Sequence, residues 1–333
     1  MSPPSIIVSR TPFRLTFAGG GTDLPAFYSA HGPGACVAGA MSKGIYVIVT
    51  ENFRSEEIRV SYRITEDALT SIDAVAHNAI REALRLLDVP SGVQIITATQ
   101  MPSQGTGIGS SSSCTVGVLN ALHRWKGHRV GPRQLAREAV RIEREILREP
   151  GGIQDQYIAA YGGINLIEVA RDGTVDVRAL ALDHDAYATL NRHLLLFFTG
   201  IERRSTDVHQ TQVAEVDDHV DEYVQMRNTA HGIAKALERV DLAEIGRLMD
   251  ENWQLKKRLS DGISNPAIDR AYALAREHGA LGGKLMGAGG GGFLFLLAPP
   301  ERHDAIAGAL AGLGMTPKAV QLEVGGSAIV LEE

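Results

Sequence analysis

The stretch of residues 101–115, MPSQGTGIGSSSSCT, restricts the fold of this 333-residue chain more than any other part of it. An apolar, β-branched run at 93–98 leads into the stretch, and a helical pattern at 116–122 follows it. This order predicts a buried strand, a glycine-rich turn and the first turn of a helix. Such a turn needs a backbone that can adopt conformations closed to most residues.

The glycines and serines of this turn predict an anion-binding site. Gly105, Gly107 and Gly109 let the backbone approach a ligand closely. The hydroxyls of residues 110–113 lie where the amides of a first helical turn lack partners, and a helix N-terminus favours phosphate. A flexible Gly/Ser linker is the alternative, but a linker is not expected between a buried strand and an amphipathic helix. The turn lacks the lysine of G-x-x-x-x-G-K-[ST], which disfavours a P-loop NTPase.

Composition and charge exclude several classes of protein. Hydrophobic residues make up 44% of the chain and charged residues 22%, which are ordinary globular values. A net charge of -6 without a basic block argues against nucleic acid as the main partner. No apolar run approaches the roughly 20 residues that span a bilayer, and residues 1–10 lack a signal-peptide layout, so we expect a cytoplasmic protein without a membrane partner. Cys36 and Cys114 lack metal-ligand spacing, which disfavours a zinc site or a disulfide.

A second glycine-rich loop follows the first predicted strand. Residues 5–17 read as a strand interrupted at Pro12, and the sequence AGGGTD occupies 18–23. A strand that ends in three glycines and an aspartate marks a place where backbone meets ligand. A tight turn in which Asp23 caps the next helical turn is the alternative.

Acidic residues in the middle of the chain are candidates for chemistry. A helical pattern at 134–147 carries Glu143 and Glu145 on opposite flanks of its apolar face, so either side chain could reach inward. After a breaker at 150–152, Asp155 lies in the segment IQDQY. Taken singly, a solvated Glu143 and a helix-capping Asp155 are the simpler interpretations.

The C-terminal part is predicted to begin with an apolar strand at 193–200, and we place the domain boundary at 190/191. Arg203 and Arg204 follow in a loop, either as a solvated basic turn or as an anion contact. Long helical patterns lie at 211–240, 242–259 and 266–278. The segment 282–293 contains G-x-G-x-x-G, but a strand follows it instead of a helix, which disfavours a dinucleotide-binding fold.

Three motifs resemble those of the GHMP kinases, the small-molecule kinases named after galactokinase, homoserine kinase, mevalonate kinase and phosphomevalonate kinase. The first, R-x-P-x-R followed by G-x-x-[TD], is matched by Arg10, Pro12, Arg14, Thr22 and Asp23. The second, P-x-x-x-G-[LI]-G-S-S-[SA], is matched by Pro102, Gly107, Ile108, Gly109, Ser110 and Ser111. The third, K-[LM]-x-G-A-G-G-G-G, lies beside the active site in the family and is matched from Lys284 to Gly292.

The resemblance implies an α+β fold of the GHMP kinase type. Residues 1–190 would form an N-terminal domain like ribosomal protein S5 domain 2, and residues 191–333 a ferredoxin-like C-terminal domain. ATP and its acceptor would meet in the cleft between them. The cofactors implied are ATP and Mg²⁺, and the partner is a small-molecule sugar phosphate, while a homodimer is compatible with the sequence.

The resemblance also implies roles for single residues. In galactokinases the catalytic aspartate lies in a similar G-I-x-D-Q-[FY] context, with the magnesium-binding glutamate twelve residues upstream, which gives Asp155 and Glu143 here. Arg14 would lie near that aspartate and stabilise the transferring charge, and Ser111 would join Glu143 on Mg²⁺. The residues implied at ATP are Pro102, Gly105, Gly107, Ile108, Gly109, Ser110, Ser111, Ser112 and Ser113. Those expected at the substrate are Gly20, Gly21, Thr22, Asp23, Gly152, Arg204, Lys284, Gly289 and Gly290.

The first motif narrows the choice of acceptor. Galactokinases have G-E-H-T-D where this chain has Gly19 to Asp23 as G-G-G-T-D. The form A-G-G-G-T-D-L-P resembles that of the bacterial D-glycero-D-manno-heptose 7-phosphate kinases, which make the 1,7-bisphosphate for nucleotide-activated heptose of lipopolysaccharide, capsule or glycoprotein. A fucose- or galactose-type sugar 1-kinase and a non-catalytic sugar or nucleotide sensor remain as alternatives. Candidate cations for the sugar's own phosphate are Lys43, Arg203, Arg204 and Lys284.

Overall fold

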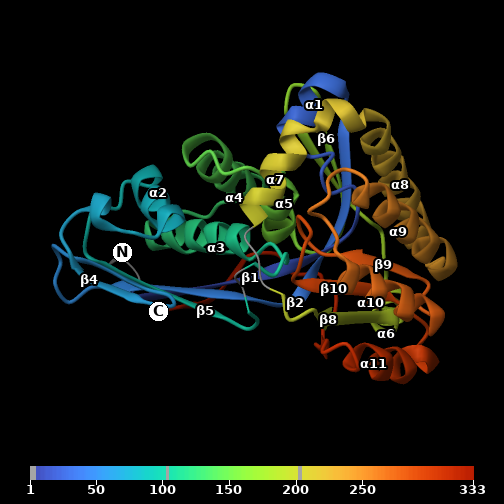
Figure 1. Cartoon of the computed structure of the whole chain (residues 1–333). Helices are drawn as coiled ribbons and strands as arrows, with labels where there is room; N and C mark the ends of the chain where they lie inside the picture. The colour runs from blue at the N-terminus through green and yellow to red at the C-terminus, as the bar shows by residue number, and fades with distance from the viewer. Residues whose placement is uncertain (1–4, 103–104, 202–204) are drawn as a thin grey trace.

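Two β-sheets with helices packed around them make up the structure, which confirms the predicted α+β fold (Figure 1). The structure is a computed structural model and describes residues 5–102, 105–201 and 205–333. The eight strands of the first sheet are β1 (Ile6–Ala18), β2 (Gly34–Glu51), β3 (Ile58–Ser61), β4 (Thr65–Leu69), β5 (Val93–Thr99), β6 (Ile164–Val169), β7 (Val175–Ala179) and β12 (Ala328–Glu332). The four strands of the second sheet are β8 (Leu194–Phe198), β9 (Gly282–Leu285), β10 (Phe293–Leu297) and β11 (Thr316–Pro317).

The helices divide between the two sheets, and several of those before β6 lie together on one side of the first sheet (Figure 1). The helices before β6 are α1 (Pro25–His31), α2 (Asn78–Leu86), α3 (Ser110–Trp125), α4 (Pro132–Val140) and α5 (Gln154–Tyr161). Those after β7 are α6 (His184–His193), α7 (Ser205–Ala214), α8 (Val220–Glu238), α9 (Leu242–Lys257), α10 (Pro266–Glu277) and α11 (His303–Ala311). Short helical turns are η1 (Ile72–Ala74), η2 (Arg141–Ile146), η3 (Val216–His219) and η4 (Pro300–Arg302). Among the residues described, we find no helix with the length and apolar character needed to span a bilayer.

β1 and β2 form the centre of the first sheet. β1 pairs antiparallel with β2 along nearly its whole length, and β5 and β6 pair with the two halves of the other edge of β2. The predicted interruption at Pro12 is wrong, because β1 is continuous there and contains a register shift between Pro12 and Arg14. Proline has no N–H to donate, and an irregularity in the ladder is where a strand tolerates it.

Three helical segments are divided in the structure, two of which were predicted as single helices. Residues 72–86 form η1 and α2, because the His77 side chain caps a new helix start by accepting from the amide of Ile80. The pattern at 134–147 begins as α4 and ends in the π-helical turn η2. The pattern at 211–240 is interrupted by η3 between α7 and α8. Apolar periodicity identifies helical segments but does not report where the backbone hydrogen-bond pattern changes.

Of the two apolar core clusters in the described residues, the larger spans both sheets. Phe17 on β1 and Phe295 on β10 are fully buried, and their rings meet edge to face with centroids 5.4 Å apart. Helix α8 packs on β2 and against α9, and α9 packs on β9. β12 returns from the end of the chain to pair with β1. The domain boundary at 190/191 stays a prediction. β12, the last strand of the proposed C-terminal part, belongs to the first sheet.

We expect Phe295→Ala to lower the free energy of unfolding by about 3–5 kcal/mol, because it removes a fully buried ring from the shared core. Urea denaturation followed by circular dichroism measures this loss as a shift of a single transition. Phe53→Ala is the control, since Phe53 is fully exposed and the change should stay within about 0.5 kcal/mol. Separate transitions, of which only one responds to Phe295→Ala, would contradict a core shared by both sheets.

Candidate active site

Two adjoining pockets lie between the two sheets. The glycine pocket, with about 930 Å³ of space including its open mouth, is lined among others by Gly105, Gly107, Gly109, Ser110, Ser111, Ser112, Glu143, Glu149 and Gly289. The basic pocket, with about 470 Å³, is lined among others by Gly20, Gly21, Asp23, Gly152, Gln154, Lys256 and Lys284. The residues that line both pockets are Arg14, Arg144, Asp155 and Gly287.

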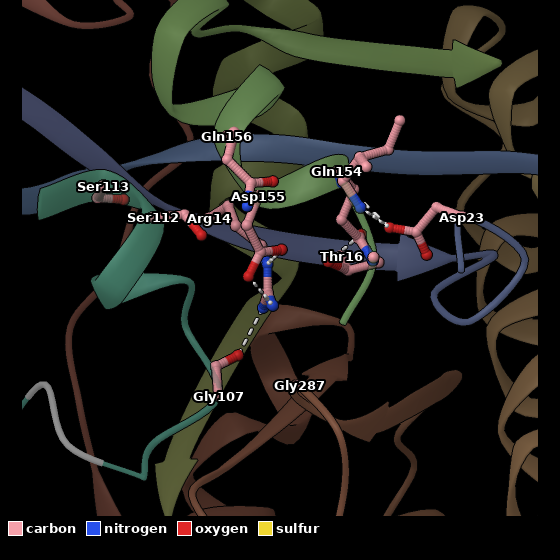
Figure 2. A network of polar contacts seen from close by, with 12 residues as sticks. Arg14, Thr16, Asp23, Gly107, Ser112, Ser113, Gln154, Asp155, Gln156 and Gly287 are labelled. Carbon is pink, nitrogen blue, oxygen red and sulfur yellow. Dashed lines mark hydrogen bonds and ion pairs between the residues drawn. The ribbon is translucent and has the colours of Figure 1, made fainter. Parts of the chain in front are cut away.

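Arg14 and Asp155 form the centre of the site (Figure 2). Arg14 Nε donates to Asp155 Oδ1 over 2.7 Å, and Arg14 Nη2 donates to Asp155 Oδ2 over 2.9 Å. This bidentate pairing fixes the plane of the carboxylate. The third nitrogen, Nη1, donates to the carbonyl of Gly107 over 2.5 Å. Asp155 lies in the first turn of α5, where the helix dipole favours a negative charge, and its side chain is 23% exposed.

Two loops whose backbones touch form one side of the glycine pocket. Gly107 has a φ of +73°, and a Cβ there would lie 2.6 Å from the carbonyl oxygen of Met286. A Cβ on Gly287 would lie 2.5 Å from the Cα of Gly107, so this close approach requires glycine on both sides. Helix α3 begins next, and its N-cap, Gly109, supplies no side-chain cap. The first amides of α3 therefore keep donors for an anionic ligand.

The serines at the start of α3 make different contacts. Ser110, Ser111 and Ser112, expected at ATP, line the glycine pocket. The hydroxyl of Ser113 instead donates to the carbonyl of Pro12 over 2.7 Å, which fastens α3 to β1. Ser113, expected at ATP, therefore contacts protein backbone, because the rotation of the helix turns its fourth residue toward the sheet.

Two further residues of the motif shape the turn. Ile108 is buried in the apolar core, and its carbonyl accepts from the amide of Arg14 over 3.1 Å. The carbonyl of Pro102 accepts from the hydroxyl of Thr106 over 3.1 Å. Both were expected at ATP, and both contribute backbone contacts that hold the loop in place.

Glu143 lies below the start of α3 as a nearly fully buried carboxylate. Its oxygens accept from Ser112 Oγ over 2.8 Å and from Thr115 Oγ1 over 2.7 Å. Gln156 Nε2 donates to the same group over 2.6 Å. The serine hydroxyl on Glu143 is thus that of Ser112, whereas Ser111, expected as its partner, lines the pocket one residue earlier.

The surroundings of Glu143 fit a magnesium ion. Glu145, on the other flank of the helix, is exposed and lines a different surface hollow. A carboxylate with hydroxyls nearby offers hard oxygen ligands, and Mg²⁺ keeps waters and substrate phosphates as its other ligands. The described residues contain no group of three or more His, Cys, Asp or Glu that could hold a metal by themselves. An ion bound here would therefore share its coordination with phosphate.

Asp23 holds the start of α5. Its Oδ2 accepts from the amides of Ile153 over 2.8 Å and Gln154 over 3.0 Å, and its Oδ1 accepts from the amide of Gly21 over 2.9 Å. The cap is therefore on α5 and not on the helical turn that directly follows Asp23, where no side-chain cap is formed. A Cβ on Gly152 would lie 1.9 Å from Asp23 Oδ2, so this contact requires glycine.

Three residues expected at the substrate, Thr22, Gly289 and Gly290, are not among the described residues that line the basic pocket. The hydroxyl of Thr22 donates to the carbonyl of Gly19 over 2.8 Å and closes the turn. Gly289 lines the glycine pocket and not the basic pocket. Gly290 donates its amide to the carbonyl of Ile263 over 2.8 Å and, among the described residues, is not one that lines either pocket.

The cations considered for the sugar's own phosphate lie in different parts of the structure. Lys284, expected at the substrate, lines the basic pocket. Lys43 lies on β2 and is not among the described residues that line the two pockets. Arg203 and Arg204 lie outside the described residues. Lys256, which the sequence analysis missed, lines the basic pocket beside Lys284.

Lys256 was missed because it belongs to no motif and lies beside Lys257 near the end of α9, where lysines usually interact with the helix dipole. One feature of the sequence could have indicated that Lys256 is buried. Lys256 follows Trp253 by three residues and Met249 by seven, so it shares their buried face.

Both buried lysines have altered acidity. Burial and, next, the nearby Arg14 guanidinium lower the pKa of Lys256 to about 8. The pKa of Lys284 lies well below its usual value because the side chain is buried and because Lys256 and Arg14 lie nearby. Burial and neighbouring cations therefore disfavour the charged form of each lysine, and the nearby Asp23 carboxylate opposes this only in part.

Comparison with protein families gives matches in both parts of the chain. Residues 72–163 match the GHMP kinases N terminal domain, and residues 233–313 match the GHMP kinases C terminal domain. The first range contains the start of α3, Glu143 and Asp155, and the second contains Lys256 and Lys284.

Similar proteins cover nearly the whole chain. A D-glycero-alpha-D-manno-heptose 7-phosphate kinase from Campylobacter jejuni is 29% identical over 310 residues, which are 89% of this chain and 90% of that protein. The crystal structure of a D-glycero-D-manno-heptose 1-phosphate kinase from Bacteriodes thetaiotaomicron shares 25% identity and has a TM-score of 0.81, covering 98% of this chain and 99% of that one. An L-fucokinase/L-fucose-1-P guanylyltransferase from Bacteroides fragilis is 27% identical over 88% of this chain but only 34% of its own length.

Proposed function

The chain belongs to the GHMP kinase family, and we propose that it transfers the γ-phosphoryl group of ATP to the anomeric hydroxyl of D-glycero-D-manno-heptose 7-phosphate. The product is the 1,7-bisphosphate, an intermediate for nucleotide-activated heptose in lipopolysaccharide or capsule synthesis. The observation that carries the proposal is the Arg14–Asp155 pair, because it lines both pockets. A donor in the glycine pocket and an acceptor in the basic pocket both reach the same carboxylate. A cytoplasmic location and a homodimer stay predictions.

The glycine pocket suits the phosphates of ATP. The first amides of α3 and the backbone of the glycine loop offer donors without side chains in the way. Glu143, with the hydroxyls of Ser111 and Ser112, would hold Mg²⁺. When bound, this ion neutralises charge on the phosphates.

Asp155 acts on the acceptor. Its carboxylate takes the proton of the anomeric hydroxyl as that oxygen bonds to the γ-phosphorus and the bond to the β–γ bridging oxygen breaks, which releases ADP. Arg14 keeps the carboxylate oriented and stabilises the charge that is transferred. The presence of Arg14, Glu143 and Asp155 in one site argues against a non-catalytic sensor.

Two observations support heptose 7-phosphate as the acceptor, one from a relative and one from the room in the basic pocket. The heptose 7-phosphate kinase of Campylobacter jejuni aligns along most of this chain. A Cβ on Gly20 would lie 3.0 Å from Gln154 Nε2 and 3.9 Å from Lys256 Nζ, so a larger residue there would fill the basic pocket. The fucokinase relative keeps a fucose-type sugar 1-kinase as the second candidate.

A substrate panel with ATP and Mg²⁺ tests the proposal. We expect kcat/KM for heptose 7-phosphate to exceed that for unphosphorylated heptose, mannose, fucose and galactose by about a hundredfold or more, the scale of two charge-assisted contacts to phosphate. A coupled assay for ADP measures turnover. A higher value for fucose or galactose would replace the heptose assignment, and sugar binding without turnover would favour a sensor.

Asp155→Asn should reduce kcat by at least about a hundredfold while the affinity for ATP stays nearly unchanged, because the general base is lost. Turnover assays and nucleotide titration measure the two quantities. Asp172→Asn, in an exposed turn, is the matched control and should leave both unchanged. Near-normal turnover of the Asp155 variant would place the base on another residue.

Glu143→Gln should raise the Mg²⁺ concentration needed for half-maximal activity about tenfold or more, because an ion would lose its charged protein ligand. Glu145→Gln, two residues away on the exposed side, should leave it unchanged. Titration of both variants with Mg²⁺ at saturating ATP measures the effect. The opposite order of effects would show that the wrong glutamate is assigned to the metal.

A further inference from the structure

The basic pocket is lined by four cations and two carboxylates, and one of these cations, Arg144, is ion-paired with Glu143 of the glycine pocket over 3.4 Å. The charged lining residues of the basic pocket are the cations Arg14, Arg144, Lys256 and Lys284 and the carboxylates Asp23 and Asp155. Asp155 forms a bidentate pair with Arg14, and Asp23 accepts three backbone amides. Neither carboxylate hydrogen-bonds a lysine within the described part of the chain.

The two lysines are buried yet border the pocket. Lys256 is 3% exposed, and its Nζ donates to the carbonyl of Gly287 over 2.8 Å, which is a neutral partner. Lys284 is 1% exposed, and its ammonium has no hydrogen bond to a described residue. Buried ammonium groups without a paired anion cost free energy. Their presence in the wall of a pocket favours an anionic ligand, which would lower that cost.

We propose that Lys256 and Lys284 form a phosphate subsite that binds the phosphate group already present on the acceptor. The proposal rests on the proposed function, and it names the residues that discriminate a sugar phosphate from a neutral sugar. A neutral sugar leaves both ammonium groups without a counter-charge. A phosphate dianion supplies two negative charges and several acceptor oxygens at once.

The phosphates of ATP are the other anions that could meet these lysines. Lys256 and Lys284 line the basic pocket and are not among the described residues that line the glycine pocket. The first amides of α3 are available as donors for phosphate in the glycine pocket. The geometry therefore assigns the lysines to the acceptor side of Asp155.

The affinity of the subsite for phosphate is expected to depend on pH. The charged and titratable groups that face the lysines are Arg14, Asp23, Cys36 and Asp155, besides the lysines themselves. The pKa of Lys256 is about 8 in the free protein, and a bound phosphate favours its charged form. Binding therefore takes up protons near pH 8, and affinity falls as the pH rises further. A sugar phosphate is mostly dianionic above about pH 6, so its own titration does not cause this fall.

Calorimetric titration of heptose 7-phosphate into the protein, with ADP and Mg²⁺ present to fill the glycine pocket, tests the subsite. Lys256→Met and Lys284→Met should each weaken binding at least about tenfold, which is the scale of one charge-assisted contact. Lys257→Met, the neighbour that pairs with Asp269, should bind as the intact protein does. Titration in two buffers of different ionisation enthalpy measures proton uptake at pH 8, which should decrease in Lys256→Met. The melting temperature of both variants should be unchanged or higher, because a buried charge is removed.

The outcomes separate the subsite from the proposed function. If the lysine variants keep the intact protein's preference for heptose 7-phosphate over heptose in turnover, the subsite is wrong while the kinase assignment stands. If they raise the KM for ATP instead, the lysines belong to the donor. If the intact protein binds mannose 6-phosphate through both lysines but does not phosphorylate heptose 7-phosphate, the subsite stands and the heptose assignment fails. The lysine variants could also show a large fall in melting temperature while they bind heptose 7-phosphate as the intact protein does. The two lysines would then have a structural role, and the proposal would be overturned.

Discussion

The Arg14 guanidinium connects three parts of the chain that are far apart in sequence. It extends from β1, pairs with Asp155 at the start of α5 and donates to the carbonyl of Gly107 in the glycine loop. A planar guanidinium has donors in fixed directions, so a lysine could not make the same three contacts. A buried cation without partners would cost several kcal/mol, which means that the loop and the helix depend on each other through this one side chain.

The second constraint is the contact between Gly107 and Gly287, because these residues belong to different halves of the chain. Backbone-to-backbone contact leaves no side chain that could adjust, so the shape of the glycine pocket depends on how the second sheet sits against the first. That arrangement depends in turn on the shared apolar core, where Phe17 packs against Phe295. The geometry of the site is therefore a consequence of packing across the whole molecule.

Sequence reasoning was strongest where a role depends on local backbone geometry. The glycine turn and the start of α3 follow from short-range rules. The spacing implied by the family resemblance selected Glu143 and Asp155, which line one pocket, and their roles stay predictions. It was weaker where a contact depends on how an element is rotated against its neighbours. Ser113 faces β1 because of the rotation of α3, which no local pattern reports. Lys256 reaches the site only because α9 packs on β9, so a motif search could not find it.

The two pockets differ in how they would bind phosphate. In the glycine pocket the donors include the first backbone amides of α3, whose partial charges do not change with pH. In the basic pocket they are lysines, whose charge depends on whether an anion is present. The net charge of -6 does not oppose either pocket, because exposed charges more than about 10 Å away are largely screened at physiological salt. Local arrangement, not net charge, therefore decides which anions such a protein can bind, and a lysine pair gives a selectivity that amides alone would not.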